Sequence, residues 1–410
     1  MTETSTAMPL AIFLLTYVGI ALGKIPGLAI DRVGIALLGA IAMVAVGVAT
    51  PREAVQAIDL PTILLLYSLM VISAQLRLGG FYSWTAARVL RLLARPRSFL
   101  LVLMVLSALL SALLANDIVC FAFTPMLTIA LLQSGLNPLP FLLGLAAASN
   151  IGSAATIIGN PQNMLIGQVG QLAFGRFIAW CAPPSLIALF AGYLVILGLY
   201  RNEMTCRHPR AVAADPAAGP VFDPWQSGKG IAAVAGLVVL FFTPIPREIA
   251  ALAIAGILLC SRRLKTRDIL GLVDWHLITL FCALFIVING LSRAYDLGRV
   301  VTFLAAGGID PHHTPTLAGL TVVLSNIFSN VPAVMLMIPF IDPLQPHLWY
   351  TLALASTFAG NLFILGSIAN LIVIEQAAHH GVSITFRAHA RAGIPVTVVS
   401  LIVLVGWGMI

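Results

Sequence analysis

Four apolar stretches of this sequence contain clusters of neutral polar side chains, mostly Asn, Ser and Thr. Amides and hydroxyls supply hydrogen-bond donors and acceptors, and burying them costs less than burying a full charge. In apolar surroundings such groups can hold an ion or a small polar ligand. We predict substrate or ion contacts from these residues, in chain order: Asn116, Asp117, Asn150, Ser153, Thr156, Asn160, Asn163, Ser329, Asn330, Asn361, Ser367 and Asn370.

Gly or Pro residues lie in or beside these clusters, although helix interiors normally avoid them. The residues expected to break the helices are Gly152, Gly159, Pro161, Gly360 and Gly366. A break exposes the N–H groups of one half-helix, whose positive dipole end suits an anion. It also exposes carbonyl groups of the preceding half, which suit a small cation. The breaks therefore predict contacts for both kinds of ion.

The composition requires a membrane. Of the 410 residues, 60% are hydrophobic and 9% are charged, whereas a soluble protein carries about 25% charged residues. Apolar runs of roughly 17–25 residues, each long enough to cross a bilayer, follow one another along the chain. The net charge is +7, but the charged residues lie between these apolar runs. We therefore predict that the protein does not bind nucleic acid.

The sequence does not offer the residue patterns that a metal site, a cofactor site or an enzyme active site would need. The five Cys residues have no metal-ligand or redox spacing, and the His residues fall at helix ends or in loops. A membrane-embedded enzyme would need paired carboxylates, a His motif or a Ser–base pair at membrane depth. We therefore predict no metal site, no cofactor and no catalytic residues.

An alternative explanation of the polar clusters is structural. Asn and Ser between membrane helices often only hydrogen-bond across a packed interface, and Gly often only permits close packing. This explanation is the better one for a single Asn. The occurrence of four clusters, each beside a Gly or Pro, favours a functional explanation for the set.

Asp117 is weighed separately, because an acid inside a membrane segment is a functional candidate. It could carry a coupling proton or bind Na⁺, and the alternative is a helix N-cap at a hairpin tip. Asp59 and Asp274 precede apolar runs and are interpreted as helix caps.

The chain repeats itself. Asp59 recurs as Asp274, and Asn163 recurs as Asn370, with offsets that differ by only a few residues. The loops on one side of the apolar runs hold 17 of the 22 Lys and Arg residues, so this side is predicted to be cytoplasmic and both termini outside. An odd number of crossings in each half inverts the second half relative to the first, as alternating access requires.

The expected fold is an all-α membrane protein with two inverted repeats of five transmembrane helices, in the cell inner membrane. The first repeat covers residues 1–200, a cytoplasmic linker covers 201–229, and the second repeat covers 230–410. Each repeat is expected to contain a re-entrant hairpin and a broken helix. The hairpins are predicted at 98–133 and 314–342, and the broken helices at 138–170 and 348–376.

The polar clusters resemble those of the ion transporter superfamily. Gly152-Ser-Ala-Ala-Thr-Ile-Ile-Gly-Asn-Pro-Gln-Asn163 is similar to the superfamily element G-G-x-A-T-x-I-G-x-P-P-N. Ala115-Asn-Asp-Ile and Ser329-Asn-Val-Pro lie where the divalent-anion/sodium symporters carry Ser-Asn-Thr. The Ala-Asn-Asp form and the segment from Gly360 to Asn370 look closer to the arsenite-permease-like branch than to the symporters or the citrate transporters.

The resemblance implies an inverted-repeat transporter with an elevator-like motion, often a homodimer. It implies that Asn116, Asn163, Asn330 and Asn370 line the substrate and ion sites. We expect a secondary active transporter of a small inorganic or organic anion, surrounded by lipid and coupled to Na⁺ or H⁺. The alternatives are an arsenite or antimonite efflux permease, a Na⁺/H⁺ antiporter and, from other classes, a channel or a membrane-embedded enzyme.

Overall fold

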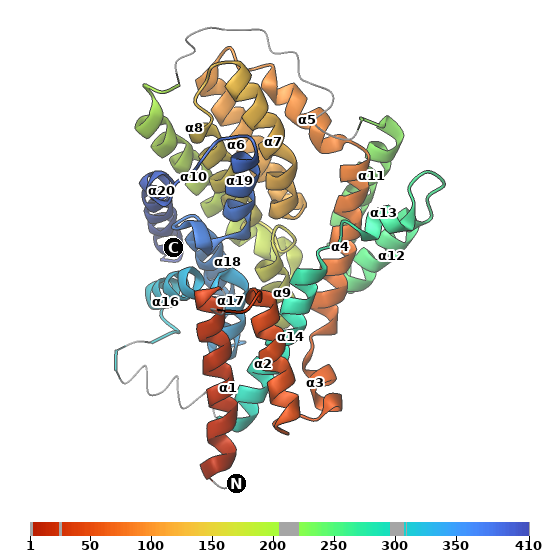
Figure 1. Cartoon of the computed structure of the whole chain (residues 1–410), viewed down its shortest axis with the longest axis vertical. Helices are drawn as coiled ribbons and strands as arrows, with labels where there is room; N and C mark the ends of the chain where they lie inside the picture. Colours follow the sequence, from red (N-terminus) through yellow and green to blue (C-terminus); the bar gives the residue numbers. More distant parts are fainter. Residues whose placement is uncertain (1–2, 24–26, 205–220, 296–306, 309, 410) are drawn as a thin grey trace.

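The computed structural model describes the chain except residues 1–2, 24–26, 205–220, 296–306, 309 and 410 (Figure 1). Every secondary-structure element in this described part is helical, which confirms the all-α fold. The elements are α1 (Glu3–Leu22), α2 (Arg32–Ala45), α3 (Pro51–Ala57), α4 (Leu60–Leu78), α5 (Phe81–Leu90), α6 (Pro96–Leu113), α7 (Asn116–Gln133), α8 (Leu139–Ser153), α9 (Pro161–Val169), α10 (Phe174–Tyr200), α11 (Pro224–Leu240), α12 (Arg247–Leu259), α13 (Thr266–Leu270), α14 (Trp275–Ala294), α16 (Thr314–Phe328), α17 (Asn330–Met337), η2 (Ile338–Phe340), α18 (Pro346–Ala359), η3 (Ile364–Gly366), α19 (Ile368–His379) and α20 (Phe386–Trp407).

Six described helices are long and apolar enough to cross a membrane: α4, α6, α7, α10, α14 and α20. Their outer surfaces are apolar as well. Leu186 and Phe190 of α10 are 65% and 58% exposed, and Ile402 of α20 is 65% exposed. Exposed apolar side chains in such number are stable only against lipid or another apolar surface.

Helices of the first half pack against helices of the second half. Helix α4 packs along α12, and α14, at the equivalent place in the second half, packs along α2. Helices α10 and α20 pack against each other. Each half therefore contributes to the packing of the other.

The predicted caps are confirmed. Asp59 Oδ1 accepts a hydrogen bond from the Thr62 N–H at 2.8 Å, at the start of α4. Asp274 Oδ1 accepts one from the Leu277 N–H at 2.9 Å, at the start of α14. Each carboxylate satisfies one of the N–H groups that the first turn of a helix leaves without a partner.

The polar clusters lie where helices end. Helices α6 and α7 meet at Leu114–Ala115, and α16 and α17 meet at Ser329. Helix α8 ends at Ser153, and α9 begins at Pro161. Helix α18 ends at Ala359, and after the turn of η3 the chain enters α19 at Ile368. Below we call the segments 154–160 and 360–367 the first and second breaks.

Two boundary details differ from the expectation. Helix α11 begins at Pro224, inside the predicted linker 201–229, most of whose remainder lies outside the described residues. A helix that the sequence did not assign, α3, follows Thr50, whose hydroxyl and backbone N–H exchange hydrogen bonds with Glu53 in a capping box. The orientation of the repeats in a bilayer stays a prediction.

The prediction that Gly152 breaks a helix is wrong. Gly152 lies within α8, where an added Cβ would be 2.3 Å from both Cα and the carbonyl oxygen of Ala108 in α6. The residue is needed because the two backbones approach too closely for a side chain. Pro161 lies at the end of the first break, as predicted, and not inside a helix. It is the first residue of α9, where its missing N–H costs no helical hydrogen bond.

This contact predicts a stability difference between two identical substitutions. Gly152→Ala should lower the thermal unfolding midpoint of the purified protein in detergent, because α6 and α8 must separate and overpacking costs about 1–3 kcal/mol. Gly198→Ala in α10 is the matched control, since no atom lies within 4 Å of its added Cβ. Its midpoint should be unchanged or slightly raised. Equal midpoints for the two variants would show that the close approach is not rigid.

Candidate ion and substrate site

One asparagine holds the first break together. The Asn163 Nδ2 group donates to the carbonyl oxygens of Thr156 at 3.0 Å, Ser153 at 3.3 Å and Ala154 at 3.5 Å. Asn163 is completely buried. These carbonyls lie at and just after the end of α8, where no further helical turn can satisfy them. A fixed polar partner replaces the water that is absent at membrane depth.

An asparagine also satisfies the free carbonyl groups of the second break. The Asn370 Nδ2 group donates to the carbonyl oxygens of Gly360 at 2.7 Å and Phe363 at 3.3 Å. Asn370 is also buried, in the first turn of α19, as Asn163 is in the first turn of α9. Both asparagines therefore lie at equivalent places and make equivalent contacts.

Polar side chains cap the helices that follow the two breaks, α9 and α19. Asn160 Oδ1 accepts from the Asn163 N–H at 2.9 Å, and Ser367 Oγ accepts from the Ala369 N–H at 3.2 Å. The Asn160 Nδ2 group also donates to Ser153 Oγ at 2.9 Å and to Thr357 Oγ1 in α18 at 3.2 Å. The first break is thereby tied to a helix of the second half.

Asn150, in α8, joins three of the four predicted clusters. Its Oδ1 accepts from Asn116 Nδ2 at 3.2 Å and from Ser367 Oγ at 2.9 Å. Its Nδ2 donates to Asn361 Oδ1 at 2.8 Å, and Asn370 Oδ1 lies 3.4 Å away. The first hairpin tip, helix α8 and the second break therefore form one buried network. We call these residues the amide network: Asn116, Asn150, Asn361, Ser367 and Asn370.

The second hairpin tip meets the second break through Asn330. The Asn330 amide lies 3.0 Å from the carbonyl oxygen of Ser356 and 2.9 Å from that of Gly366, so its nitrogen faces them as the donor. Ser329, just before it, has φ 76° and ψ 162°, a conformation that is essentially restricted to glycine. The tip is thus strained and held in place by hydrogen bonds.

The remaining predicted residues support the first break. Ser153 Oγ donates to the Asn150 carbonyl at 2.8 Å, and Thr156 Oγ1 donates to the Ala112 carbonyl in α6. An added Cβ at Gly159 would lie 2.3 Å from the Ser153 carbonyl oxygen. The Gly159 carbonyl accepts from the Asn116 N–H at 3.2 Å. The first hairpin tip and the first break are therefore in direct backbone contact.

Glycines of the second break are also confined by close neighbours. An added Cβ at Gly360 would lie 3.1 Å from the Asn330 side-chain amide, and one at Gly366 would lie 2.9 Å from Asn326 Oδ1. Neither residue has a positive φ angle. These positions therefore require glycine because a side chain would not fit, and not because of a left-handed backbone conformation.

Asp117 is not an N-cap, so the structural alternative for it is wrong. Helix α7 begins at Asn116, its N-cap is Ala115, and no side chain caps it. Asp117 lies in the first turn, half-buried, and no hydrogen bond joins its carboxylate to any residue that the structure describes. An acid next to Asn116 is thus left free to bind a proton or a cation.

Several atoms of the clusters have no protein partner among the described residues. They include the side-chain oxygens of Asn116 and Asn163 and the side-chain nitrogen of Asn361, all buried. An unpaired buried amide group is costly. Two oxygens suit a small cation and the nitrogen suits a negatively charged or carbonyl oxygen.

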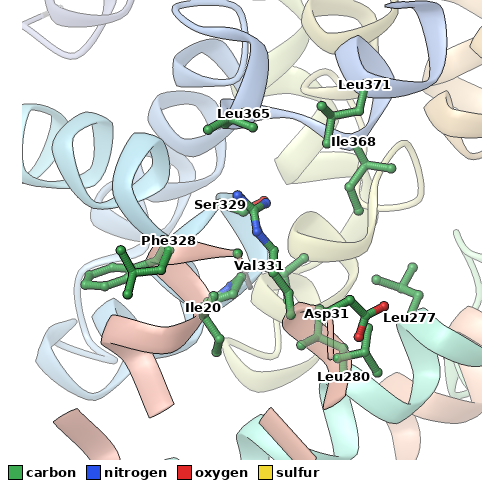
Figure 2. Close-up of a pocket in the computed structure, with 15 residues that line it drawn as sticks. Ile20, Asp31, Leu277, Leu280, Phe328, Ser329, Val331, Leu365, Ile368 and Leu371 are labelled. Atoms are coloured by element: carbon green, nitrogen blue, oxygen red, sulfur yellow. The ribbon is translucent and has the colours of Figure 1, made fainter. Parts of the chain in front are cut away.

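A cavity of about 460 Å³ reaches the second hairpin tip (Figure 2). Figure 2 shows Ser329 and Val331 of the tip between Asp31, Leu277 and Leu280 on one side and Leu365, Ile368 and Leu371 on the other. Arg32 also lines the cavity. Ser329 is the one predicted site residue among its lining residues, so the other predicted residues do not line this cavity.

Sequence reasoning missed several contacts to the clusters. His389, expected at a helix end, is buried in the first turn of α20 with Nε2 3.2 Å from the Asn361 carbonyl oxygen. Asn326 Nδ2 donates to the Ala359 carbonyl at 3.2 Å, beside the second break. The Asn326 position in the apolar run before Ser329 was a usable signal. The His389 sequence context, near the basic residues Arg387 and Arg391, indicated a surface position instead.

Broken helices and hairpin tips that meet in a buried polar cluster define a membrane transporter. Comparison with known proteins agrees. Residues 17–359 match the family described as Citrate transporter. The chain belongs to this family, within the ion transporter superfamily.

Relatives match along nearly the whole chain. A 46 kDa membrane protein of Mycobacterium leprae (strain TN) is 30% identical over 97% of this chain and 96% of its own length. The silicon efflux transporter LSI3 of Oryza sativa subsp. japonica is 29% identical over 92% of each chain. The crystal structure of the Alcanivorax borkumensis YdaH transporter is similar in fold, with a TM-score of 0.56 at 14% identity, covering 99% of this chain and 97% of that chain.

The central place of Asn150 predicts a large effect of its removal. Asn150→Ala removes the acceptor of Asn116 Nδ2 and of the Ser367 hydroxyl and the donor to Asn361 Oδ1, which costs about 1–3 kcal/mol for each buried group left unpaired. We expect a lower unfolding midpoint and a severe loss of transport in membranes that still contain the protein.

The control is Asn137→Ala, because the Asn137 side chain makes its contacts at the exposed surface, where it donates to Glu203 and accepts from the Leu139 N–H at the start of α8. This variant should lower the midpoint only by the loss of one helix-start hydrogen bond, about 1 kcal/mol, and should keep wild-type transport. If Asn150→Ala behaved like Asn137→Ala in both measurements, the amide network would have no central role.

Proposed function

We propose that the protein is a secondary active transporter of a small inorganic or organic anion, coupled to Na⁺ or H⁺, and that it works by alternating access in the cell inner membrane. The observation that carries this proposal is the network around Asn150. It connects polar breaks from both halves of the chain at 2.8–3.4 Å. A transporter needs its site at such a junction between repeats.

The chemistry of the network supports binding of a cation. The unpartnered oxygens of Asn116 and Asn163 are neutral, buried and rigidly held. Neutral oxygens from amides and unwound backbone coordinate Na⁺ in broken-helix transporters. Asp117, next to Asn116 and without a hydrogen bond to any described residue, offers a second route, since its carboxylate can take up a proton.

The anion is supported by the cavity and by its charges. Arg32 and Asp31 both line the cavity beside the hairpin tip, and the Asp31 carboxylate is held at the start of α2, where it accepts from the Gly34 N–H at 2.9 Å. A cavity of about 460 Å³ lies within the range of sites for small molecules. A guanidinium facing such a cavity favours an anion.

Efflux of arsenite or antimonite is the second candidate. One relative supports the direction of transport, since the rice protein is named a silicon efflux transporter. The amide network also consists of groups that hydrogen-bond to neutral hydroxyls as readily as to anions. A Na⁺/H⁺ antiporter is a further candidate. It is supported by Asp117, whose carboxylate can bind either ion.

Flux in proteoliposomes tests the proposal. Sulfate, phosphate, arsenite, citrate and succinate are tested under imposed Na⁺ and H⁺ gradients separately. We expect one gradient to stimulate accumulation of one of the anions. Stimulation of arsenite alone would favour the second candidate. No flux under either gradient would contradict anion transport and favour cation exchange, for which Na⁺/H⁺ exchange is then measured.

Proton coupling through Asp117 makes a separate prediction. Asp117→Asn should lose pH-driven accumulation but keep counterflow exchange, because a permanently neutral side chain can fill the site yet cannot carry a proton. Asp268→Asn, at an exposed position in α13, is the matched control and should leave both activities unchanged. Unchanged pH-driven accumulation in Asp117→Asn would remove Asp117 from the coupling mechanism.

A further inference from the structure

Arg247, the first residue of α12, holds the end of α9. Its Nη1 donates to the Leu172 carbonyl at 2.9 Å, and its Nη2 donates to the Gly167 carbonyl at 2.7 Å. A helix C-terminus leaves carbonyl oxygens unpaired and carries partial negative charge. The planar guanidinium fork fits two such oxygens at once. We call this contact the α9 clamp.

Arg32 occupies the equivalent place in the first half, as the first residue of α2, but makes no such contact. It is half-buried, and no hydrogen bond or ion pair joins its guanidinium to any described residue. It lines the cavity of Figure 2 together with Ile368 and Leu371 from the first turn of α19. Arg32 therefore shares a cavity with the beginning of α19, whereas Arg247 holds the end of α9.

The end of α19 has the same backbone turn as the end of α9. After α9, Gln171 has φ 48° and the Leu172 N–H donates to the Gly167 carbonyl at 3.1 Å. After α19, Gly381 has φ 79° and the Val382 N–H donates to the Ala377 carbonyl at 3.0 Å. The carbonyl groups of Ala377 and Val382 thus correspond to those that Arg247 holds.

We propose that Arg32 and Arg247 are positioning residues that exchange roles during transport. In the described state Arg247 holds the end of α9, and Arg32 has no hydrogen bond or ion pair to a described residue. In the opposite state Arg32 holds the Ala377 and Val382 carbonyls, and Arg247 is released. This inference rests on the proposed alternating access and names contacts that fix its two end states.

The geometry sets the size of the movement. From Leu371, which now shares a cavity with Arg32, to Ala377 is six residues of α19, or about 9 Å along the helix axis. Helix α19 must slide by about this distance past the start of α2. Leu365, now 52% exposed in the cavity wall, would be carried past α2 and covered.

Two contacts that lack equivalents favour the described state. Gln168 Nε2 donates to Glu248 Oε2 at 3.0 Å, beside the α9 clamp. The equivalent positions are Ala378 and Val33, which cannot form this bond. The Tyr17 hydroxyl also donates to the Pro332 carbonyl at 3.1 Å, which attaches α1 to the second hairpin tip. These two contacts explain why the described state is the populated one. Removal of the α9 clamp takes away two further hydrogen bonds of this state and should shift the population toward the opposite state.

The test is the labelling rate of Leu365→Cys with a water-soluble maleimide, without substrate, in a protein whose five natural Cys residues are replaced. Arg247→Ala should slow labelling on the order of tenfold, as expected for loss of hydrogen bonds to a charged group. Arg32→Ala alone should leave the rate at or above that of the parent. Adding Arg32→Ala to Arg247→Ala should restore much of the rate, because the opposite state then loses its clamp too.

Controls separate this outcome from simple damage. Arg52→Ala, at an exposed position in α3, should leave the labelling rate unchanged. Arg247→Lys, which can reach one carbonyl at a time, should give an intermediate rate. An unchanged or faster rate in Arg247→Ala, or no recovery in the double variant, would overturn the proposal, since a purely structural Arg247 has no reason to respond to Arg32.

The labelling result is independent of the substrate. A restored rate in the double variant together with silence across the anion panel would support the exchange of clamps and reject the proposed cargo. Anion flux without recovery in the double variant would support the proposed function and reject the clamps.

Discussion

The architecture depends on the satisfaction of backbone carbonyl groups where helices end inside the membrane. Lipid offers no hydrogen bonds, so each broken helix needs a partner from the protein itself. Asn163 and Asn370 supply it, each by donating to carbonyls of the break that precedes its own helix. Because these amides must be buried and fixed, the polar residues around them are buried and fixed as well. The candidate site is therefore assembled from the groups that make the breaks stable.

The two halves use the same parts but make different contacts. Helix α4 packs against α9, whereas its equivalent α14 packs against α17 at the second hairpin tip. Figure 1 shows α9 and α17 near the middle of the molecule and α19 displaced from α2 and α14. Under the proposed alternating access, unequal contacts of a repeated sequence are expected of a single state, because exchanging the two sets of contacts would form the opposite state.

Local chemistry was predictable from the sequence, and contacts between distant segments were not. The caps Asp59 and Asp274 and the helix ends near Ser153 and Pro161 follow from composition and spacing. The central position of Asn150 in the amide network does not follow from the sequence. Its partner Asn361 is 211 residues away, and any of the buried amides could have been the central residue. Gly152 was misinterpreted for the same reason. Its role is set by Ala108, a neighbour in space and not in sequence.

The central claim is that the amide network binds a ligand and does not only hold helices together. The most direct test is the thermal unfolding midpoint of the purified protein, titrated with Na⁺ and with each anion, for the wild type and for Asn116→Ala, which removes an unpartnered buried oxygen. Ligand binding to the folded state raises the midpoint with concentration. The account predicts such a rise in the wild type and its loss in the variant. An equal rise in both proteins would contradict it.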